Sequence, residues 1–144
     1  MPIPFPDAEK ALVDHLNTLT PGIAPNARVV TWVQDTKENN TLIEQGGVFI
    51  IVRRVAGQQI NRVIDKPVME ITVIAATRAK SWDILRKLQS RLVGWYGDVH
   101  HKDGSVTTIT RVDETRGPNQ FPDLNPDARR VRANLILSIR RPRR

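Results

Sequence analysis

The sequence of 144 residues contains no cysteine, one tyrosine and only 5% aromatic residues. Without cysteine the chain cannot form a disulfide framework, an iron–sulfur cluster, a thiolate zinc site or a cysteine nucleophile. No apolar run approaches the roughly 20 residues that cross a bilayer, and residues 1–6 lack the basic and apolar regions of a signal peptide. We therefore expect a soluble intracellular or virion protein with no membrane partner. Its length predicts one domain, residues 1–144.

The excess of positive charge lies at the carboxyl end of the chain. There are 22 Lys and Arg against 15 Asp and Glu, which gives a net charge of +7. Residues 1–128 are formally neutral, and arginines in the last 16 residues supply the whole excess: Arg129, Arg130, Arg132, Arg140, Arg141, Arg143 and Arg144. Arginine forms planar bidentate contacts with carboxylates and phosphates. The basic end therefore indicates an anionic partner, either DNA or an acidic protein surface, or else a solvated terminus.

Hydrophobic spacing predicts two helices. One runs from Asp7 to about Leu19, before a stop at Pro21-Gly22, and the other from the N-cap Ser81 to a stop at Gly97. Strands are expected over residues 28–33, 48–55, 68–76, 106–112 and 129–140, and long loops over residues 34–47 and 113–127. The order α-β-β-β-α-β-β predicts an α+β domain with a mixed or antiparallel sheet and both helices packed on one face.

Both ends of the chain differ from this body. Residues 1–6 are expected to form an extended N-terminal segment, and residues 140–144 a basic C-terminal tail. In the last strand, apolar residues from Val131 to Ile139 alternate with polar ones. Alternate strand residues face opposite sides of a sheet, so one face should pack into the core. The opposite face should be largely basic, with Arg130, Arg132 and Arg140 on it.

The titratable residues do not form a recognisable metal site. Asp98, His100, His101 and Asp103 share one turn, but adjacent histidines diverge and no second cluster completes a ligand set, which favours surface polarity. Residues 123–127 begin like a calcium loop. That loop requires glycine at its sixth position and glutamate at its twelfth, where this chain has Ala128 and Asn134. We expect no bound metal.

Nucleophilic and phosphate-binding motifs are also missing. Ser105 lies in Asp-Gly-Ser-Val rather than in a Gly-x-Ser-x-Gly turn, and no histidine has a recognisable role beside it. Gly46-Gly47 is not followed by the lysine of a phosphate-binding loop. The sequence therefore predicts neither an enzyme nor a cofactor.

The tryptophans and one histidine are expected to pack. Trp82 and Trp95 belong to the second predicted helix, and His15 lies on the apolar stripe of the first. Trp32 stands beside the predicted loop 34–47. Packing is the favoured interpretation for Trp32, with a subunit contact as the alternative, because tryptophan is enriched at interface hot spots.

Several segments together resemble the tail-terminator proteins of long-tailed bacteriophages. They are Pro4–Glu9 opening a helix that continues through residues 13–16, residues 48–55 followed by Gly57, residues 65–68, the helix at residues 79–92, and Gly117-Pro118 with residues 121–123 before an arginine-rich last strand. The resemblance covers most of the chain.

The resemblance implies a structural virion protein that forms a homo-hexameric ring at the head-proximal end of the tail tube. There it would stop polymerisation of the major tail-tube protein and join a head-completion or connector (stopper) protein. DNA would pass through the lumen without specific binding, and assembly would take place in the host cytoplasm. A head-to-tail ring needs two different lateral patches on each subunit. Long loops suit them, here residues 34–47, 61–66 and 113–127.

Candidate contacts with the ring neighbour or the partners are one tryptophan and a set of arginines: Trp32, Arg53, Arg54, Arg130, Arg132, Arg140, Arg141, Arg143 and Arg144. For the tail 140–144 we favour an acidic protein partner, because dense immobilised arginines in a channel would hold phosphates and slow DNA. Two alternatives stay open. One is another neck protein, and the other is a small DNA-binding protein that uses the arginine-rich strand and tail. Low aromatic content and the lack of a basic helix face argue against the latter.

Overall fold

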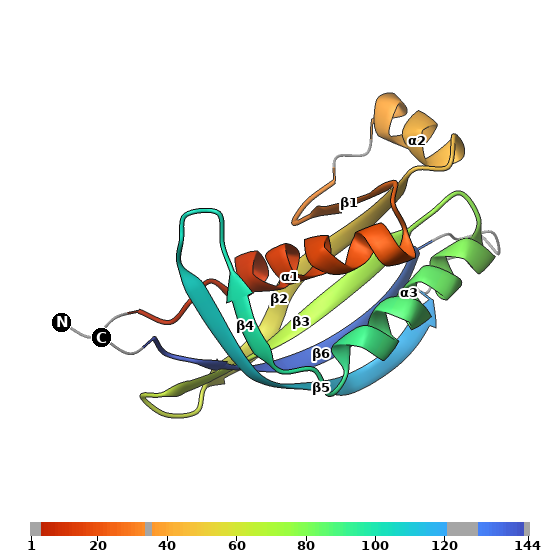
Figure 1. The fold of residues 1–144 in the computed structure, drawn as a ribbon. Helices are drawn as coiled ribbons and strands as arrows, with labels where there is room; N and C mark the ends of the chain where they lie inside the picture. The colour runs from red at the N-terminus through yellow and green to blue at the C-terminus, as the bar shows by residue number, and fades with distance from the viewer. Residues whose placement is uncertain (1–3, 34–35, 121–129, 143–144) are drawn as a thin grey trace.

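The computed structural model describes residues 4–33, 36–120 and 130–142. They form one α+β domain in which helices α1 (Ala8–Ile23) and α3 (Arg78–Leu92) lie across one face of a sheet (Figure 1). Helix α2 (Lys37–Glu44) stands apart from both, at one end of the molecule. The predicted fold class is confirmed. Within the described ranges, no helix is both long and apolar enough to span a bilayer.

The sheet has six strands in the order β1-β2-β3-β6-β5-β4. In chain order they are β1 (Ala27–Val30), β2 (Val48–Gln59), β3 (Ile64–Ile74), β4 (Gly97–His100), β5 (Val106–Gln120) and β6 (Arg130–Arg140). β1 runs parallel to β2, and every other neighbouring pair is antiparallel. The sheet is therefore mixed, with the short strands β1 and β4 at its two edges.

The main core lies between the sheet and helices α1 and α3. The alternation predicted for the last strand is confirmed, since one set of its side chains is fully buried: Val131, Ala133, Leu135, Leu137 and Ile139. They meet the apolar stripes of the two helices, including Leu12 and Leu16 of α1 and Leu85 and Leu88 of α3. Burial of each valine, leucine or isoleucine side chain contributes about 1.5–3 kcal/mol, so this layer fixes the orientation of the opposite face.

Helix α2 was not predicted, because residues 34–47 were expected to be a loop. Thr36 caps the helix by accepting a hydrogen bond from the Asn39 N–H. Ile43 is the buried residue of α2, and it packs with Phe49 and Ile51 in a second apolar cluster on the far side of the sheet. A short helix with one buried residue has no apolar periodicity to detect.

The helix ends also differ from prediction. α1 continues past Pro21 to Ile23, because a proline in the last turn removes a single backbone hydrogen bond. α3 begins at the cap Thr77 rather than at Ser81. Ser81 is buried within the helix, and its hydroxyl accepts a hydrogen bond from the Ala75 N–H. α3 ends at Leu92, which leaves residues 97–100 for the unpredicted strand β4.

Three strands are longer than expected and one is shorter. The polar residues after 55 continue β2 and pair with an extended β3 in a long hairpin, with an irregular register between Arg54 and Ala56. β5 runs through the first part of the predicted loop 113–127 to Gln120. The rest of that loop lies outside the described residues. β1 covers residues 27–30 of the strand predicted over 28–33.

Candidate functional site

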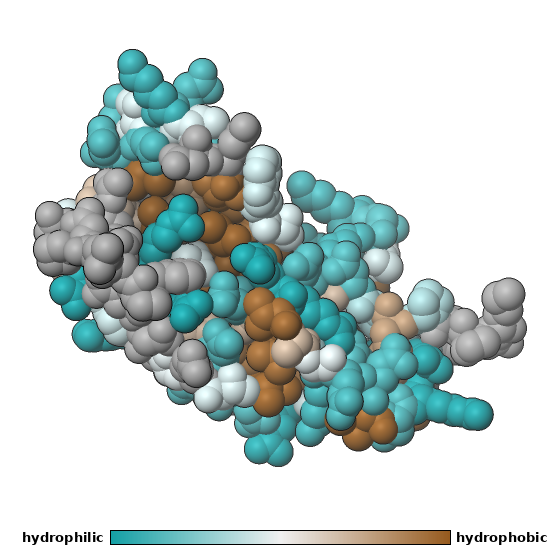
Figure 2. Space-filling model, turned by 180° about the vertical axis from the view of Figure 1, so that it is seen from behind, coloured by the Kyte–Doolittle hydropathy of each residue, from teal (hydrophilic) through white to brown (hydrophobic). Residues whose placement is uncertain are grey.

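The face of the sheet that α1 and α3 do not cover carries a cluster of arginines, and we call it the open face. Figure 2 views the molecule from this side, where separate apolar areas interrupt a largely hydrophilic surface. Arg130 is exposed, whereas Arg132 and Arg140 are half-buried. These three arginines alternate with the buried core residues of β6, as the sequence predicted. Their positions place the positive charge on the open face.

Glu70 lies on the same face, beside Arg53 and Arg132. It is opposite Arg53 in the register of β2 and β3, and its Oε2 is 3.7 Å from Nη1 of Arg132. One carboxylate cannot neutralise both guanidinium groups together with that of Arg130. Among the described residues on this part of the open face, arginine side chains thus outnumber carboxylates, which favours a partner surface that presents carboxylates or phosphates.

Arg54 and Arg141 lie elsewhere. Arg54 donates two hydrogen bonds to Asp65, of 2.9 Å and 3.1 Å, and Asp65 is only 1% exposed. The Arg141 guanidinium lies 4.3 Å from the centroid of the Phe5 ring, and its backbone N–H donates to the Val63 carbonyl. Both arginines thus make contacts within the chain. Arg143 and Arg144 lie outside the described residues.

The two edges of the sheet each present an exposed aromatic residue. Trp32 follows β1 and is 72% exposed, and Tyr96 precedes β4 and is 75% exposed. Packing, the favoured interpretation for Trp32, is wrong. Tyr96 was not predicted as a contact residue. The sequence does hold a signal, because Tyr96 falls off the apolar stripe of the helix that was predicted to extend to Gly97. Large exposed aromatic side chains are typical of protein contacts.

Trp82, Trp95 and His15 pack as predicted. Both tryptophans lie against the main core. The rings of His15 and Trp95 stack with their centroids 3.9 Å apart. Burial lowers the pKa of His15 below its ordinary value. His15 is therefore a packing residue.

A cleft of about 490 Å³ opens beside the edge strand β1. Its walls come from the start of β1 and from the segment that links α2 to β2. They combine apolar and polar groups: Pro25, Asn26, Ala27, Arg28, Leu42, Gln45, Gly46, Gly47, Val48 and Phe49. Such a lining suits a side chain with an apolar body and a polar tip.

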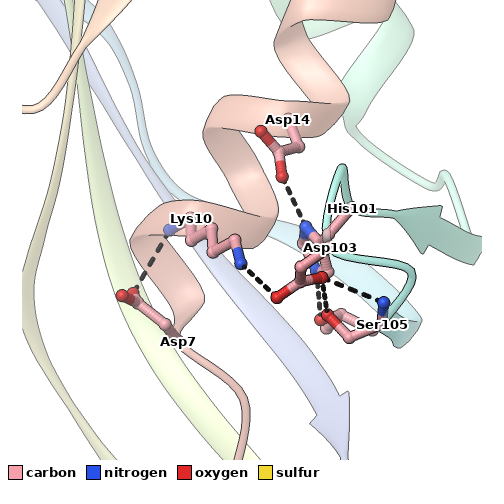
Figure 3. A network of polar contacts seen from close by, with 7 residues as sticks. Asp7, Lys10, Asp14, His101, Asp103 and Ser105 are labelled. Atoms are coloured by element: carbon pink, nitrogen blue, oxygen red, sulfur yellow. Dashed lines mark hydrogen bonds and ion pairs between the residues drawn. The ribbon is translucent and has the colours of Figure 1, made fainter.

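A polar network joins α1 to the turn between β4 and β5 (Figure 3). Nδ1 of His101 contacts the Asp14 carboxylate, and its Nε2 lies 2.7 Å from the Thr107 hydroxyl. His101 is buried, so the expectation of surface polarity is wrong for this residue. His100 and Asp98 are exposed. Within the described ranges, no group of acidic or histidine residues could hold a metal ion.

The second half of the network is exposed. Asp103 accepts hydrogen bonds from the Ser105 hydroxyl and N–H, and its Oδ2 is 3.1 Å from Nζ of Lys10. The Ser105 donors, followed by Lys10, hold the pKa of Asp103 well below its ordinary value. The Ser105 hydroxyl thus faces a carboxylate rather than a histidine.

The line of contacts from Asp14 through His101 to Thr107 resembles the acid, base and nucleophile of a catalytic triad. However, Thr107 is only 2% exposed, so a substrate could not reach its hydroxyl. The contacts instead attach the β4–β5 hairpin to α1 over 87 residues of sequence. The arrangement stabilises the fold.

Comparison with known proteins identifies the family of the chain. A search of curated proteins found no match to the chain. The family model described as "Phage tail termination protein" matches residues 4–144, nearly the whole chain. This is a family of structural virion proteins, whose members interact with other phage tail and head components. The chain belongs to the phage tail termination protein family and is a structural component of the virion tail.

Proposed function

We propose that the protein forms a ring that caps the head-proximal end of the phage tail tube. In this position it ends polymerisation of the major tail-tube protein and joins the tail to the head connector. The main observation that supports this proposal is the presence of two unlike edge strands in the sheet, β1 and β4, each beside an exposed aromatic residue. A ring requires two different patches that bind each other head to tail. Six subunits are the number implied by the resemblance to tail terminators.

The arginines of the open face provide a second surface for a different partner. Arg53 and Arg132 lie beside Glu70, Arg130 lies further along β6 opposite Ile74, and Arg140 lies toward the other end of β6 opposite Ile64. An acidic surface on the connector protein would be complementary to this charge. Trp32 belongs instead to the lateral contacts of the ring.

In this role the protein makes and breaks no bond. Binding to tube, connector and neighbouring subunits is its whole activity, and DNA passes through the lumen without a sequence-specific contact. Arg54 and Arg141, which contact Asp65 and Phe5, support the subunit itself.

The test mixes the purified protein with purified tail tubes and images the mixture by negative-stain electron microscopy. We expect rings at one end of each tube, and no further growth at that end when tube protein is added. Free protein that never attaches to tubes would contradict the proposal. A duplex-DNA titration at several salt concentrations is run in parallel. Tight binding that weakens steeply with salt would favour the DNA-binding alternative.

A further inference from the structure

We propose that neighbouring subunits join by parallel pairing of β1 in one copy with β4 in the next, and that Tyr96 of one copy enters the cleft beside β1 of the other. The inference rests on the proposed ring and assigns its lateral contact. Each edge of the sheet is thereby covered by a second copy of this chain.

The directions of the strands fit this contact. β1 is parallel to β2, and four antiparallel steps lead from β2 through β3, β6 and β5 to β4. β1 and β4 therefore run in the same direction. Rotation about an axis along the strands preserves that direction, so it brings β1 of one copy parallel to β4 of the next. Contact across a two-fold axis would instead pair β1 with β1, antiparallel.

The edges are free to pair along their outer sides. Within the described part of the chain, each has a hydrogen-bonded strand on one side only, β2 for β1 and β5 for β4. Both have four residues, so the lengths match. An unpaired edge strand presents backbone N–H and C=O groups to a partner. Edge pairing in the ring would satisfy the groups that the monomer leaves open.

Charges on the two edges are complementary. Arg28 of β1 is exposed and lies beside Phe49, whose side chain is on the open face. Asp98 of β4 is exposed and opposite Thr108, which in turn is opposite Arg140 of the open face. Arg28 and Asp98 thus project from the same face. Parallel pairing keeps that face continuous across the contact, so Arg28 can lie beside Asp98 of the next copy and fix the register.

This register brings Tyr96 to the cleft. When Arg28 lies beside Asp98 of the next copy, Tyr96 of that copy, two residues earlier, lies beside Asn26. Asn26 lines the cleft, together with Leu42 and Phe49. The ring of Tyr96 would cover these apolar groups, and its hydroxyl would meet polar ones such as Gln45. Tyr96, which is 75% exposed in the single subunit, thereby gains a site of matching chemistry.

Trp32 marks the other end of the contact. It lies four residues after Arg28, so the same register places it near the turn between β4 and β5 of the next copy. That turn is attached to α1 by His101 and Asp14. A rigid turn gives the exposed indole a fixed surface to pack against. The two aromatic residues thus close the two ends of a short strand pair.

The first test uses cysteine cross-linking, which the cysteine-free sequence allows without background. Neighbouring strands are about 4.8 Å apart, within the range of about 4.4–6.8 Å between the Cα atoms of a disulfide. The Arg28→Cys, Asp98→Cys double variant is assembled on tail tubes and mildly oxidised. We expect a ladder of covalent oligomers on a denaturing gel. A matched double variant, Arg28→Cys with Lys87→Cys on the exposed side of α3, should stay monomeric.

Single variants settle the symmetry of the contact. Arg28→Cys or Asp98→Cys by itself should give no covalent dimer, whereas an equal mixture of the two variants should give one. Efficient dimerisation of Arg28→Cys alone would show a two-fold β1 contact and overturn the inference. Rings that cap tubes without cross-linking would overturn this contact and leave the ring proposal standing. Wild-type protein that forms no ring on tubes would overturn both.

The second test addresses Tyr96 directly. Because the side chain is 75% exposed, Tyr96→Ala should fold with an unchanged melting temperature. We expect Tyr96→Ala to lose assembly into subunit rings on tubes. Tyr96→Phe, which keeps the aromatic side chain, should assemble. Val93→Ala, which removes another exposed apolar side chain, serves as the control. Wild-type assembly by Tyr96→Ala would overturn the role of the cleft.

Discussion

Asp65 illustrates how a single buried charge depends on one partner. Its carboxylate is 1% exposed and receives two hydrogen bonds from Arg54. Arg54→Met would leave this charge buried without its partner. The Arg54 side chain is 36% exposed, so water can reach the site and reduce the loss. We expect the free energy of unfolding, measured by urea denaturation, to fall by about 2 kcal/mol.

The neighbouring arginine provides the control. Arg53 is exposed and projects from the open face, and Arg53→Met should change the free energy of unfolding by less than about 0.5 kcal/mol. Equal losses in the two variants would contradict the different roles assigned to these adjacent residues.

His15 predicts a pH dependence of stability. Burial lowers its pKa in the folded state, so the unfolded chain binds the proton more tightly. As the pH falls below about 6.5, the unfolded state is favoured, by at most about 1.4 kcal/mol per pH unit from this one group. Above that pH, His15 adds no pH dependence to the free energy of unfolding.

The measurement compares urea unfolding of the wild type and His15→Phe between pH 8 and pH 5. Phenylalanine keeps the stack on Trp95 but cannot be protonated. We expect the variant to lose less stability on acidification than the wild type. His100→Phe, at an exposed position, should follow the wild-type curve. Parallel curves for the wild type and His15→Phe would show that another group causes any acid sensitivity.

At the level of residues, sequence spacing predicted packing where local periodicity controls it. His15 and Trp82 lie on helices, Trp95 follows α3 closely, and all three pack. His101 was wrongly expected at the surface, because its partner Asp14 is 87 residues away and no local pattern connects them. Arg53 and Arg54 looked alike for the same reason, since the carboxylate of Asp65 that distinguishes them belongs to the next strand.

The long β2–β3 hairpin depends on one glycine. Gly57 has φ of +100°, and a Cβ at this position would lie 2.2 Å from the Lys66 carbonyl oxygen. Gly57→Ala therefore combines an unfavourable backbone conformation with a collision against backbone atoms. We expect the free energy of unfolding, measured by urea denaturation, to fall by about 1–3 kcal/mol or more.

Gly22→Ala is the comparison, because a Cβ there meets nothing within 4 Å and φ is not positive. It should be neutral or stabilising by up to about 1 kcal/mol. If Gly57→Ala were as stable as Gly22→Ala, the register of the hairpin would need revision.

Elements with strong periodic burial were predicted, and elements that depend on distant contacts were not. α1, α3 and the central strands carry continuous apolar stripes or runs, which the sequence shows directly. β4 has one buried residue, Val99, and is a strand because β5 pairs with it. The polar ends of β2 and β3 pair with each other, and the polar end of β5 pairs with β6. These strand ends depend on backbone hydrogen bonds, which leave no mark in hydropathy.

For the whole molecule, the open face should act in joining the tail to the head. Arg53→Glu with Arg130→Glu reverses two exposed charges on that face and leaves the sheet edges intact. We expect rings to form and cap tubes normally. Joining to heads, scored as the fraction of complete particles by electron microscopy, should fall by about tenfold, because like charges would then face each other.

Arg91→Glu changes an exposed arginine on α3 and serves as the control, with normal joining expected. A loss of head joining in this variant as well would indicate a general effect of net charge rather than a specific surface.

The α+β architecture and the basic face of β6 could be predicted because both follow from alternation within single segments. The edge positions of Trp32 and Tyr96 could not be predicted. They depend on the strand order, which places β1 and β4 at opposite edges of the sheet although neither is at an end of the chain. The arginine-rich carboxyl end predicted contacts through charged side chains. The lateral contact proposed for the ring depends instead on two aromatic residues, Tyr96 and Trp32.

The length of the tail tube is the most direct measure of the proposed function. Purified tube protein is polymerised from short tube segments, the protein is added partway, and tube lengths are followed over time by electron microscopy. We expect growth at the capped end to stop at once and tube lengths to stay constant while free tube protein remains. Continued growth at the wild-type rate, with the protein present in excess, would contradict it.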